Sequence, residues 1–248
     1  MPASERYAII SDIHGNLRAL QAVLAMIREY GAQKICCLGD VVGYGANSAA
    51  CLKLVRENCQ YVVQGNHDAQ IQPPRDPAMR PEAVEALDYA LSTLGLPEIA
   101  WLKKLPHPLL VDNHFVIAHG ALAGRDEYIL KQDDVRLNLQ LLTTGYPMAQ
   151  LLFFGHTHLP MALTATAAKT DFKEGGTVTV SPDKQYLFNP GSVGQSRDGC
   201  PMASFCIYDP DDCQVIYLRA EYDIAGEQDD MRKAGLPERS INRIALGR

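Results

Sequence analysis

Short apolar runs alternate with longer amphipathic stretches over the first quarter of the chain. Three short buried strands are predicted, over residues 6–11, 33–39 and 60–65. Two helices are predicted between them, over residues 16–31 and 47–59. In the first helix, Asn16 suits the N-cap and Gly31 suits the C-terminal stop. Strands that alternate with helices in this way favour a parallel α/β sheet.

The rest of the chain changes pattern twice. Residues 73–108 contain helical pieces broken by prolines, which predicts a helical insertion beside the core. From about Pro160 the pattern becomes a series of short strands, typical of an antiparallel or mixed sheet. Residues 221–248 are polar and are expected to form a tail lying on the surface. No internal repeat is present, so residues 1–248 are expected to form a single domain with this insertion and tail.

The composition is that of an ordinary globular protein, with 47% hydrophobic and 21% charged residues. A net charge of −6 and the lack of a basic stripe disfavour long nucleic acid as a partner. No apolar run approaches the roughly 18–20 residues that span a bilayer, so no membrane partner is expected. The N-terminus lacks the features of a secretory signal, and the seven cysteines contain no C-x-x-C pair. We therefore expect a cytoplasmic protein with reduced thiols.

Five predicted strands end at side chains that can bind metal or move protons, usually beside a glycine. These side chains are Asp12 and His14, Asp40, Asn66 and His67, His119, and His156 and His158. The carboxyl ends of parallel strands share one edge of a sheet, so these residues are expected to converge on one cleft. Of the seven histidines, only His107 and His114 stand elsewhere, and chance does not readily give this order.

The chemical types of these side chains indicate a transition-metal site. Carboxylate, amide and imidazole ligands together suit Mn, Fe, Zn, Co or Ni. Asp12 and His14 lie two residues apart, so on an extended chain their side chains point the same way, and His156 and His158 share this spacing. So many ligands exceed the needs of one tetrahedral ion and match two ions about 3.5–4 Å apart. Asp40 can bridge the two ions, because each of its oxygens can bind one.

Each position taken alone also has a simpler interpretation. A single D-x-H spacing has a prior of roughly one in ten for metal binding. Asp40 suits a turn, Asn66 suits a helix cap, and His119 alone suits a hydrogen-bonded histidine of the core or surface. The ordered set of positions favours the metal site over these separate alternatives.

The set of motifs SDIHGN, GDVVGYG, GNHD, AHG and GHTH resembles the calcineurin-like metallophosphoesterase superfamily. The later segment NPGSVGQSRDG is similar to that of small prokaryotic phosphodiesterases in this group. The resemblance extends over about residues 7–209. It implies a four-layer α/β/β/α sandwich in which two mixed sheets face each other and helices cover the outside.

The resemblance also implies roles for individual residues. Asp12, His14 and His158 would hold one metal ion. Asn66, His119 and His156 would hold the second, and Asp40 would bridge them. His67 matches the histidine that family members place beside the leaving group of the substrate rather than on a metal ion.

The sequence departs from the protein phosphatase branch at Gly43 and Tyr44. That branch carries an Asp-Arg pair at these positions, in which the Asp supports the catalytic histidine and the Arg grips phosphate. The departure weakens an assignment as a protein phosphatase. It also leaves open what orients His67, for which Asp68 or a backbone carbonyl is the suggested replacement.

The resemblance implies a dinuclear-metal-dependent phosphodiesterase that hydrolyses small phosphorylated molecules. A metal-bridging hydroxide would attack phosphorus, and protonated His67 would donate to the leaving oxygen. Manganese is the expected activating ion. A dinucleoside polyphosphate hydrolase, a serine/threonine protein phosphatase and a non-catalytic metal-binding scaffold remain alternatives. The physiological substrate, native metal and oligomeric state are left open.

Four further residues are candidates for supporting roles. Arg125 and Arg197 are candidates for substrate binding, since guanidinium groups suit phosphate, although each also suits a solvent-facing turn. Asn189 and Ser192 either orient ligand histidines or shape the turn that contains them.

Overall fold

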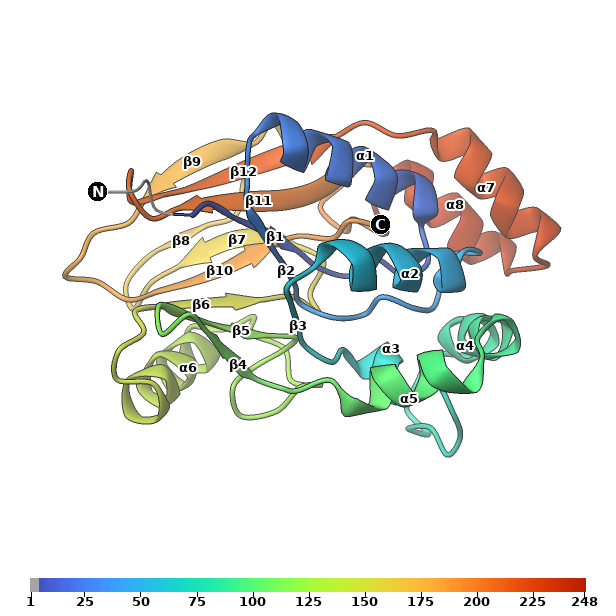
Figure 1. The fold of residues 1–248 in the computed structure, drawn as a ribbon, viewed down its shortest axis with the longest axis horizontal. Helices are drawn as coiled ribbons and strands as arrows, with labels where there is room; N and C mark the ends of the chain where they lie inside the picture. Colours follow the sequence, from blue (N-terminus) through green and yellow to red (C-terminus); the bar gives the residue numbers. More distant parts are fainter. Residues whose placement is uncertain (1–4) are drawn as a thin grey trace.

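Two six-stranded mixed sheets face each other in the computed structural model, which describes residues 5–248 (Figure 1). The first sheet contains, in order, β3 (Tyr61–Val62), β2 (Lys34–Cys37), β1 (Tyr7–Ile10), β11 (Ala203–Asp209), β12 (Gln214–Ala220) and β9 (Gly176–Thr179). The second contains β4 (Leu109–Val111), β5 (Phe115–Ala118), β6 (Leu151–Phe154), β10 (Tyr186–Pro190), β7 (Pro160–Leu163) and β8 (Ala168–Lys169). The predicted four-layer α/β/β/α class is confirmed.

Helices cover the outer faces of both sheets. The first sheet carries α1 (Leu17–Glu29) and α2 (Ser48–Asn58), and the second carries α6 (Gln132–Gly145). Beside one end of the sheets lie α3 (Asn66–Ala69), α4 (Pro81–Thr93), α5 (Leu96–Lys104), α7 (Ile224–Lys233) and α8 (Glu238–Leu246). Among residues 5–248, no helix combines the length and apolar character needed to cross a bilayer.

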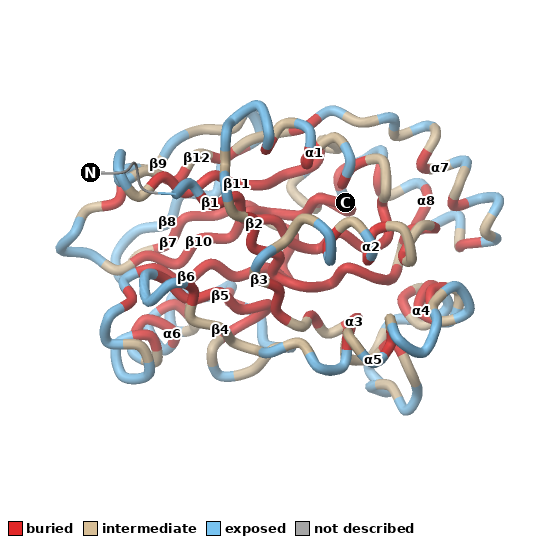
Figure 2. The backbone as a smooth tube through the Cα atoms, viewed as in Figure 1, coloured by how far each residue is buried: buried red, intermediate tan, exposed pale blue. Residues whose placement is uncertain are grey.

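Three apolar clusters fill the three spaces between the four layers. Successive strand residues point to opposite faces, so Ile9 packs between the sheets while Ile10 packs under α1 and α2. Phe115 and Phe153 of the second sheet meet the first sheet in the middle cluster. Both faces of the central strands are therefore buried, as Figure 2 shows.

The parallel strands place their carboxyl ends at one edge of each sheet. In the first sheet β1 pairs parallel with β2, and β2 pairs parallel with β3. In the second, β5 and β10 both pair parallel with β6. The strand predicted over 60–65 ends early, because Gly65 becomes the N-cap of α3 and its N–H donates to the Asp68 carboxylate.

The first predicted helix is confirmed in detail. The Asn16 side chain accepts a hydrogen bond from Ala19 N, and Gly31 has a left-handed φ of +67° just after the helix. The apolar side of α1 is buried at Leu20, Leu24 and Ile27, as its spacing predicts.

The last segment differs from its prediction. Residues 221–248 were expected to lie on the surface as a polar tail, but they form α7 and α8. Met231, Ile241 and Ile244 from these helices are buried in a separate apolar cluster with Ala46 and Ala86. Isolated apolar residues at helical spacing bury one side of each helix, while the many charges stay outside and lower the average hydrophobicity.

Candidate metal and catalytic site

Loops that follow the carboxyl ends of the parallel strands bring the predicted ligands together. Three groups of residues have donor atoms that lie within 4.8 Å of one another. Two contain predicted ligands alone, namely Asp12, His14 and His158, and Asp40, His119 and His156, and the third joins His14 and Asp40 to His67. Asn66 joins the second group, with its Oδ1 3.0 Å from His119 Nε2. Residues that are up to 146 positions apart in the sequence, from Asp12 to His158, therefore share one site.

The separations between donor atoms suit coordination of an ion in each group. His158 Nε2 lies 3.1 Å from His14 Nε2 and 3.4 Å from Asp12 Oδ1. Asp40 Oδ2 lies 3.6 Å from His14 Nε2 and 3.5 Å from His119 Nε2, so it is near both groups. Ligands at about 2.0–2.2 Å from a metal are separated from one another by distances of this size.

Asp12 provides a direct test of whether these residues fit a cation. Its Oδ2 accepts hydrogen bonds from Ser11 Oγ and His156 N. Its Oδ1 is buried and has no hydrogen-bond partner within residues 5–248. An unpartnered carboxylate oxygen is costly to bury, and a cation among imidazoles would supply what it lacks. The donor set therefore fits transition-metal ions.

The electrostatics of the site favour three neutral histidines, His14, His156 and His158, beside an ionised Asp40 and a protonated His119. Burial lowers the pKa of His14 and His158 well below the usual value, and that of His156 to about 3. Burial opposes ionisation of Asp40, yet the charges of His119 and His67 hold its pKa well below the usual range. Burial likewise opposes charge on His119, but Asp40 raises its pKa to about 9. Metal binding would displace that proton.

Five of the seven predicted ligands have left-handed backbone conformations, which non-glycine residues rarely adopt. The φ angles are +54° at Asp12, +49° at His14, +52° at Asp40, +67° at His156 and +60° at His158. The expectation of an extended chain at Asp12–His14 and at His156–His158 is therefore wrong, although the side chains of each pair still lie in one site. Such strain persists only where surrounding contacts hold it, and it clusters at functional sites.

Asp68 holds the loop that carries Asp40. Its carboxylate accepts hydrogen bonds from the N–H groups of Asp40 at 2.8 Å, Val41 at 3.0 Å and Gly65 at 3.0 Å. These bonds occupy both oxygens, and none reaches the His67 ring. The suggestion that Asp68 orients this ring is therefore wrong.

His67 is positioned instead by its backbone and by packing. Its N–H donates to Asp40 Oδ1 at 2.8 Å, and its ring lies against those of His14 at 4.7 Å and Tyr44 at 4.8 Å between centroids. A Cβ at Gly43 would lie 2.5 Å from His67 Nδ1, so only glycine leaves room for the ring. Gly43 and Tyr44, which replace the Asp-Arg pair, thus enclose this histidine.

Backbone carbonyls orient three of the ligand rings. The Nδ1 atoms of these rings face carbonyl oxygens, in the pairs His14–Val42 at 3.2 Å, His119–Leu38 at 2.8 Å and His158–Gln195 at 2.6 Å. A proton on Nδ1 leaves the Nε2 lone pair free for a metal ion. Sequence reasoning missed these partners because a backbone carbonyl has no side-chain signature.

Asn189 and Ser192 contact the loops rather than the rings. Asn189 Nδ2 donates to Gly155 O at 2.8 Å and to Thr157 Oγ1 at 3.1 Å. Ser192 Oγ donates to Asp12 O at 2.8 Å. Within their own turn, Asn189 Oδ1 accepts from Gly191 N at 2.9 Å and Ser192 Oγ accepts from Gln195 N at 2.8 Å, so they also shape that turn, which is the second of the two roles left open.

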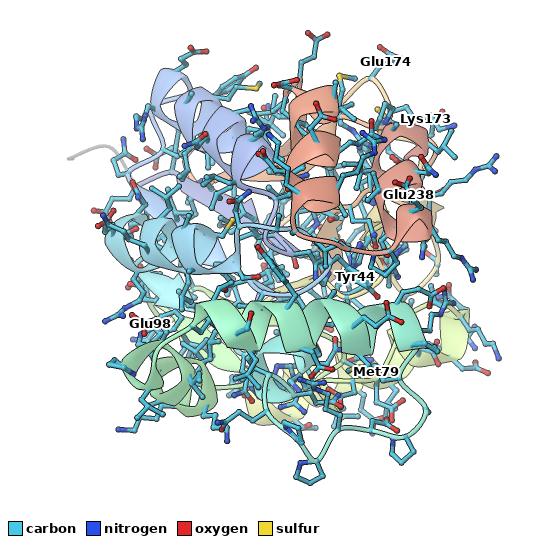
Figure 3. The ribbon with its side chains drawn as sticks, turned by 90° about the vertical axis from the view of Figure 1, so that its right-hand side faces the viewer. Tyr44, Met79, Glu98, Lys173, Glu174 and Glu238 are labelled. Atoms are coloured by element: carbon cyan, nitrogen blue, oxygen red, sulfur yellow. The ribbon has the colours of Figure 1, made fainter. Side chains whose placement is uncertain are left out.

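A cleft of about 260 Å³ opens over the donor groups. His67 and four of the predicted ligands line its floor. One wall is lined by Gln70, which precedes the insertion, and by five residues of the insertion: Asp76, Ala78, Met79, Arg80 and Ala83. Figure 3 shows Tyr44 between α4 and the C-terminal helices, with Met79 in the loop before α4. Tyr128, which the sequence did not suggest, stacks on His156 with 4.0 Å between the ring centroids.

The two candidate arginines have different environments. Arg197 lines the cleft, and its Nε is buried without a hydrogen-bond partner among the described residues. Arg125 donates to Gln64 Oε1 and Asp126 Oδ1, each at 2.7 Å, and is not among the residues that line the cleft. Only Arg197 is therefore placed to meet a bound anion.

Comparison with known proteins identifies the class to which this fold and site belong. The profile of the calcineurin-like phosphoesterase superfamily domain matches residues 6–212, so the chain belongs to this superfamily. The resemblance seen in the motifs is thus confirmed. Membership of this family implies a metal-dependent phosphoesterase.

Individual relatives cover nearly the whole chain. The uncharacterized protein MJ0912 of Methanocaldococcus jannaschii is 37% identical over 97% of this chain and 98% of its own length. Phosphodiesterase YfcE of Escherichia coli K12 is 29% identical over 87% of this chain and 93% of its own length. The crystal structure of a metallophosphoesterase from Sphaerobacter thermophilus is 36% identical with a TM-score of 0.84, over 98% of this chain and 99% of that one.

Proposed function

We propose that this protein is a dinuclear-metal-dependent phosphodiesterase that hydrolyses small phosphorylated molecules. The observation that carries the proposal is the position of Asp40, whose Oδ2 lies within 3.6 Å of a ligand nitrogen in each donor group. A shared carboxylate between two groups of this composition is what a pair of ions requires.

The proposed ligands of the two ions follow the two donor groups. One ion is held by Asp12, His14 and His158, the other by Asn66, His119 and His156, and both by Asp40. Manganese is the proposed activating ion. When bound, the ions would lower the pKa of a coordinated water and neutralise charge on the phosphoryl oxygens.

His67 is the proposed proton donor to the leaving oxygen. The ring lines the cleft, and its Nδ1 is buried against Gly43, which leaves Nε2 as the nitrogen that can meet substrate. One nitrogen of His67 also lies within 4.8 Å of donor atoms of His14 and Asp40, so a role as a ligand is the competing interpretation. The two roles differ in whether removal of the ring also removes metal.

Arg197 is the proposed contact to the phosphoryl group. Its unpartnered Nε and its place in the cleft suit an anion. Arg125 is retained as a proposal only for a conformation in which its contacts to Gln64 and Asp126 are broken.

Phosphodiesters are favoured over phosphoproteins as substrates by two observations. Gly43 and Tyr44 occupy the positions of the Asp-Arg pair of protein phosphatases, and the relative YfcE is named a phosphodiesterase. A dinucleoside polyphosphate hydrolase is the second candidate, because Arg80 joins Arg197 in lining the cleft and offers a cation to a further phosphate.

The seven cysteines are all free, which supports a cytoplasmic location.

The test is hydrolysis of bis(p-nitrophenyl) phosphate, dinucleoside polyphosphates and monoesters by protein whose metal content has been measured. We expect manganese-dependent release of p-nitrophenol that disappears after chelation and returns with the metal. Full metal occupancy without turnover of any ester would instead identify a non-catalytic scaffold.

A further inference from the structure

A small cavity lies behind the ligand loops, where α7 and α8 pack against them. Its volume is about 10 Å³, and Tyr44 forms part of its wall as well as part of the lining of the cleft. Gln195 and Glu227 also line it. A volume of this size holds one water molecule, provided that the walls offer polar partners.

Two unpartnered polar groups face this cavity. Glu227 of α7 is fully buried, and neither of its carboxylate oxygens has a hydrogen-bond partner within residues 5–248. Gln195 Nε2 is likewise buried without a partner. One group lacks a donor and the other lacks an acceptor, so a single water between them would satisfy both.

The surroundings of Glu227 leave its carboxyl group only partly compensated. Burial raises its pKa to about 7, while the backbone N–H groups of Arg18 and Ala46 act in the opposite direction without completing a hydrogen bond of good geometry. A buried carboxyl group that contributed only to packing would cost stability there. Its presence calls for a further partner.

Gln195 connects the cavity to the catalytic site through three other contacts. Its backbone carbonyl faces His158 Nδ1 at 2.6 Å, and its N–H donates to Ser192 Oγ at 2.8 Å. Its side-chain Oε1 accepts from Arg197 Nη2 at 3.4 Å. Because Oε1 and Nε2 belong to one planar amide, whatever holds Nε2 also holds the acceptor that faces Arg197.

We propose that one water molecule occupies this cavity and bridges the Glu227 carboxyl group to Gln195 Nε2, which makes Glu227 a positioning residue for Arg197. This inference rests on the proposed function, in which Arg197 contacts the phosphoryl group. Glu227 lies beyond residue 212, where the match to the superfamily profile ends, so the C-terminal helices add this support to the shared domain.

Three variants on α7 separate positioning from packing. E227L removes the acceptor, and E227Q keeps an oxygen that can accept from the water. D230N is the matched control. Asp230 lies on the same helix as Glu227, but it pairs with Arg18 of α1 at 3.1 Å and does not line the cavity. For bis(p-nitrophenyl) phosphate, we expect E227L to raise KM about three- to tenfold, the effect of one hydrogen bond, with a smaller change in kcat. E227Q and D230N should keep the wild-type KM.

Binding of inorganic phosphate by calorimetry gives a readout that does not require turnover. The affinity of the metal-loaded protein should fall about three- to tenfold in E227L and not in E227Q. The Tm of E227L should not fall, because leucine removes a buried carboxyl group that lacks partners. A lower Tm with unchanged KM and unchanged phosphate affinity would show a packing role and overturn the proposal.

A double-mutant cycle with Q195L tests the pathway. If Glu227 acts through Gln195, the E227L/Q195L variant should have the KM of Q195L alone, whereas independent effects would multiply and refute the link. If E227L does not fold, a high-resolution crystal structure of the unmodified protein still tests the proposal. A water between Glu227 and Gln195 supports it, and a cavity without water overturns it. Failure of the proposed function looks different, because the wild type would then hydrolyse no phosphodiester at all.

Discussion

Two surfaces enclose the cleft, and they differ in burial, backbone conformation and hydrogen bonding. The ligand floor consists of His67 and the seven proposed ligands, all of which are buried except the half-buried Asn66. The insertion wall consists of Gln70, just before the insertion, and Asp76, Ala78, Met79, Arg80 and Ala83 within it, and of these six residues only Ala83 is buried. The floor is thus part of the core of the domain, and the wall is part of its surface.

Hydrogen bonds hold the two surfaces in different ways. The loops of the floor are tied by groups such as Asp68 and Ser192, which fix backbone that would otherwise relax from its left-handed conformation. The wall is anchored at its base by Arg75, which donates to Gln70 O, Ile71 O and Asp88. Within residues 5–248, no hydrogen bond or ion pair holds the side chain of Arg80. We therefore expect the chemical step to depend on the buried, hydrogen-bonded floor, and substrate selectivity to depend on the more exposed wall.

The largest effect is expected from loss of the carboxylate that both donor groups share. Asp40→Asn should lower metal content and reduce hydrolysis of bis(p-nitrophenyl) phosphate about 10³-fold or more, because several kcal/mol of transition-state stabilisation depends on the ions. Metal analysis and initial rates on the same samples check both. The same substitution on the wall, Asp76→Asn, should leave metal content unchanged. Equal metal loss in Asp40→Asn and Asp76→Asn would show that metal binding does not distinguish the floor from the wall.

His67 tests whether a floor residue can serve chemistry without holding metal. His67→Ala should retain both ions and lose turnover by a factor of ~10²–10⁴, the range for removal of a general acid. Rates measured on samples of equal metal content are the required comparison. Wild-type turnover would exclude the proposed role, and a parallel loss of metal would make His67 a ligand.

Gly43 tests how much the packing around His67 contributes. Gly43→Ala places a methyl group only 2.5 Å from His67 Nδ1, at a φ of +95°, so the ring has to move. A displacement of the ring should lower kcat about 10- to 100-fold with metal retained. Gly31→Ala is the matched control, since its φ of +67° is also left-handed but no atom lies within 4 Å. That variant should lose about 1 kcal/mol of stability and no activity. If both variants keep full activity, the Gly43–His67 contact does not position the ring.

The parts of the fold that were predictable are those in which local sequence patterns determine the structure. The buried strands and α1 were predictable from the spacing of their apolar residues, and the parallel pairing of β1, β2 and β3 was predictable from the alternation of strands and helices. The C-terminal helices escaped prediction because their buried residues, such as Met231 and Ile241, are isolated among charges. Their apolar partners, Ala46 and Ala86, lie far away in the chain, so no local pattern reveals that they pack together.

The site was predictable where function depends on side-chain type and not where it depends on shape. Carboxylates and imidazoles at strand ends are recognisable in the sequence as possible metal ligands. The carbonyl partner of His119 and the stacking of Tyr128 on His156 have no recognisable sequence pattern. The roles of Arg125 and Arg197 looked equal in sequence, because the direction of a side chain in a loop is set by tertiary contacts. Left-handed ligands were missed for the same reason, since local preference disfavours them.

The smallest effect is expected on the insertion wall. Arg80→Gln should raise KM for a small phosphodiester about two- to fivefold and leave kcat and metal content unchanged, because an exposed cation acts through a screened field. The increase in KM should shrink as salt is added. Arg136→Gln on α6, which removes an exposed cation paired only with Asp133, controls for net charge and should not change KM. A fall in kcat comparable to that of His67→Ala would mean that the wall takes part in the chemical step, and the division between a catalytic floor and a selective wall would not hold.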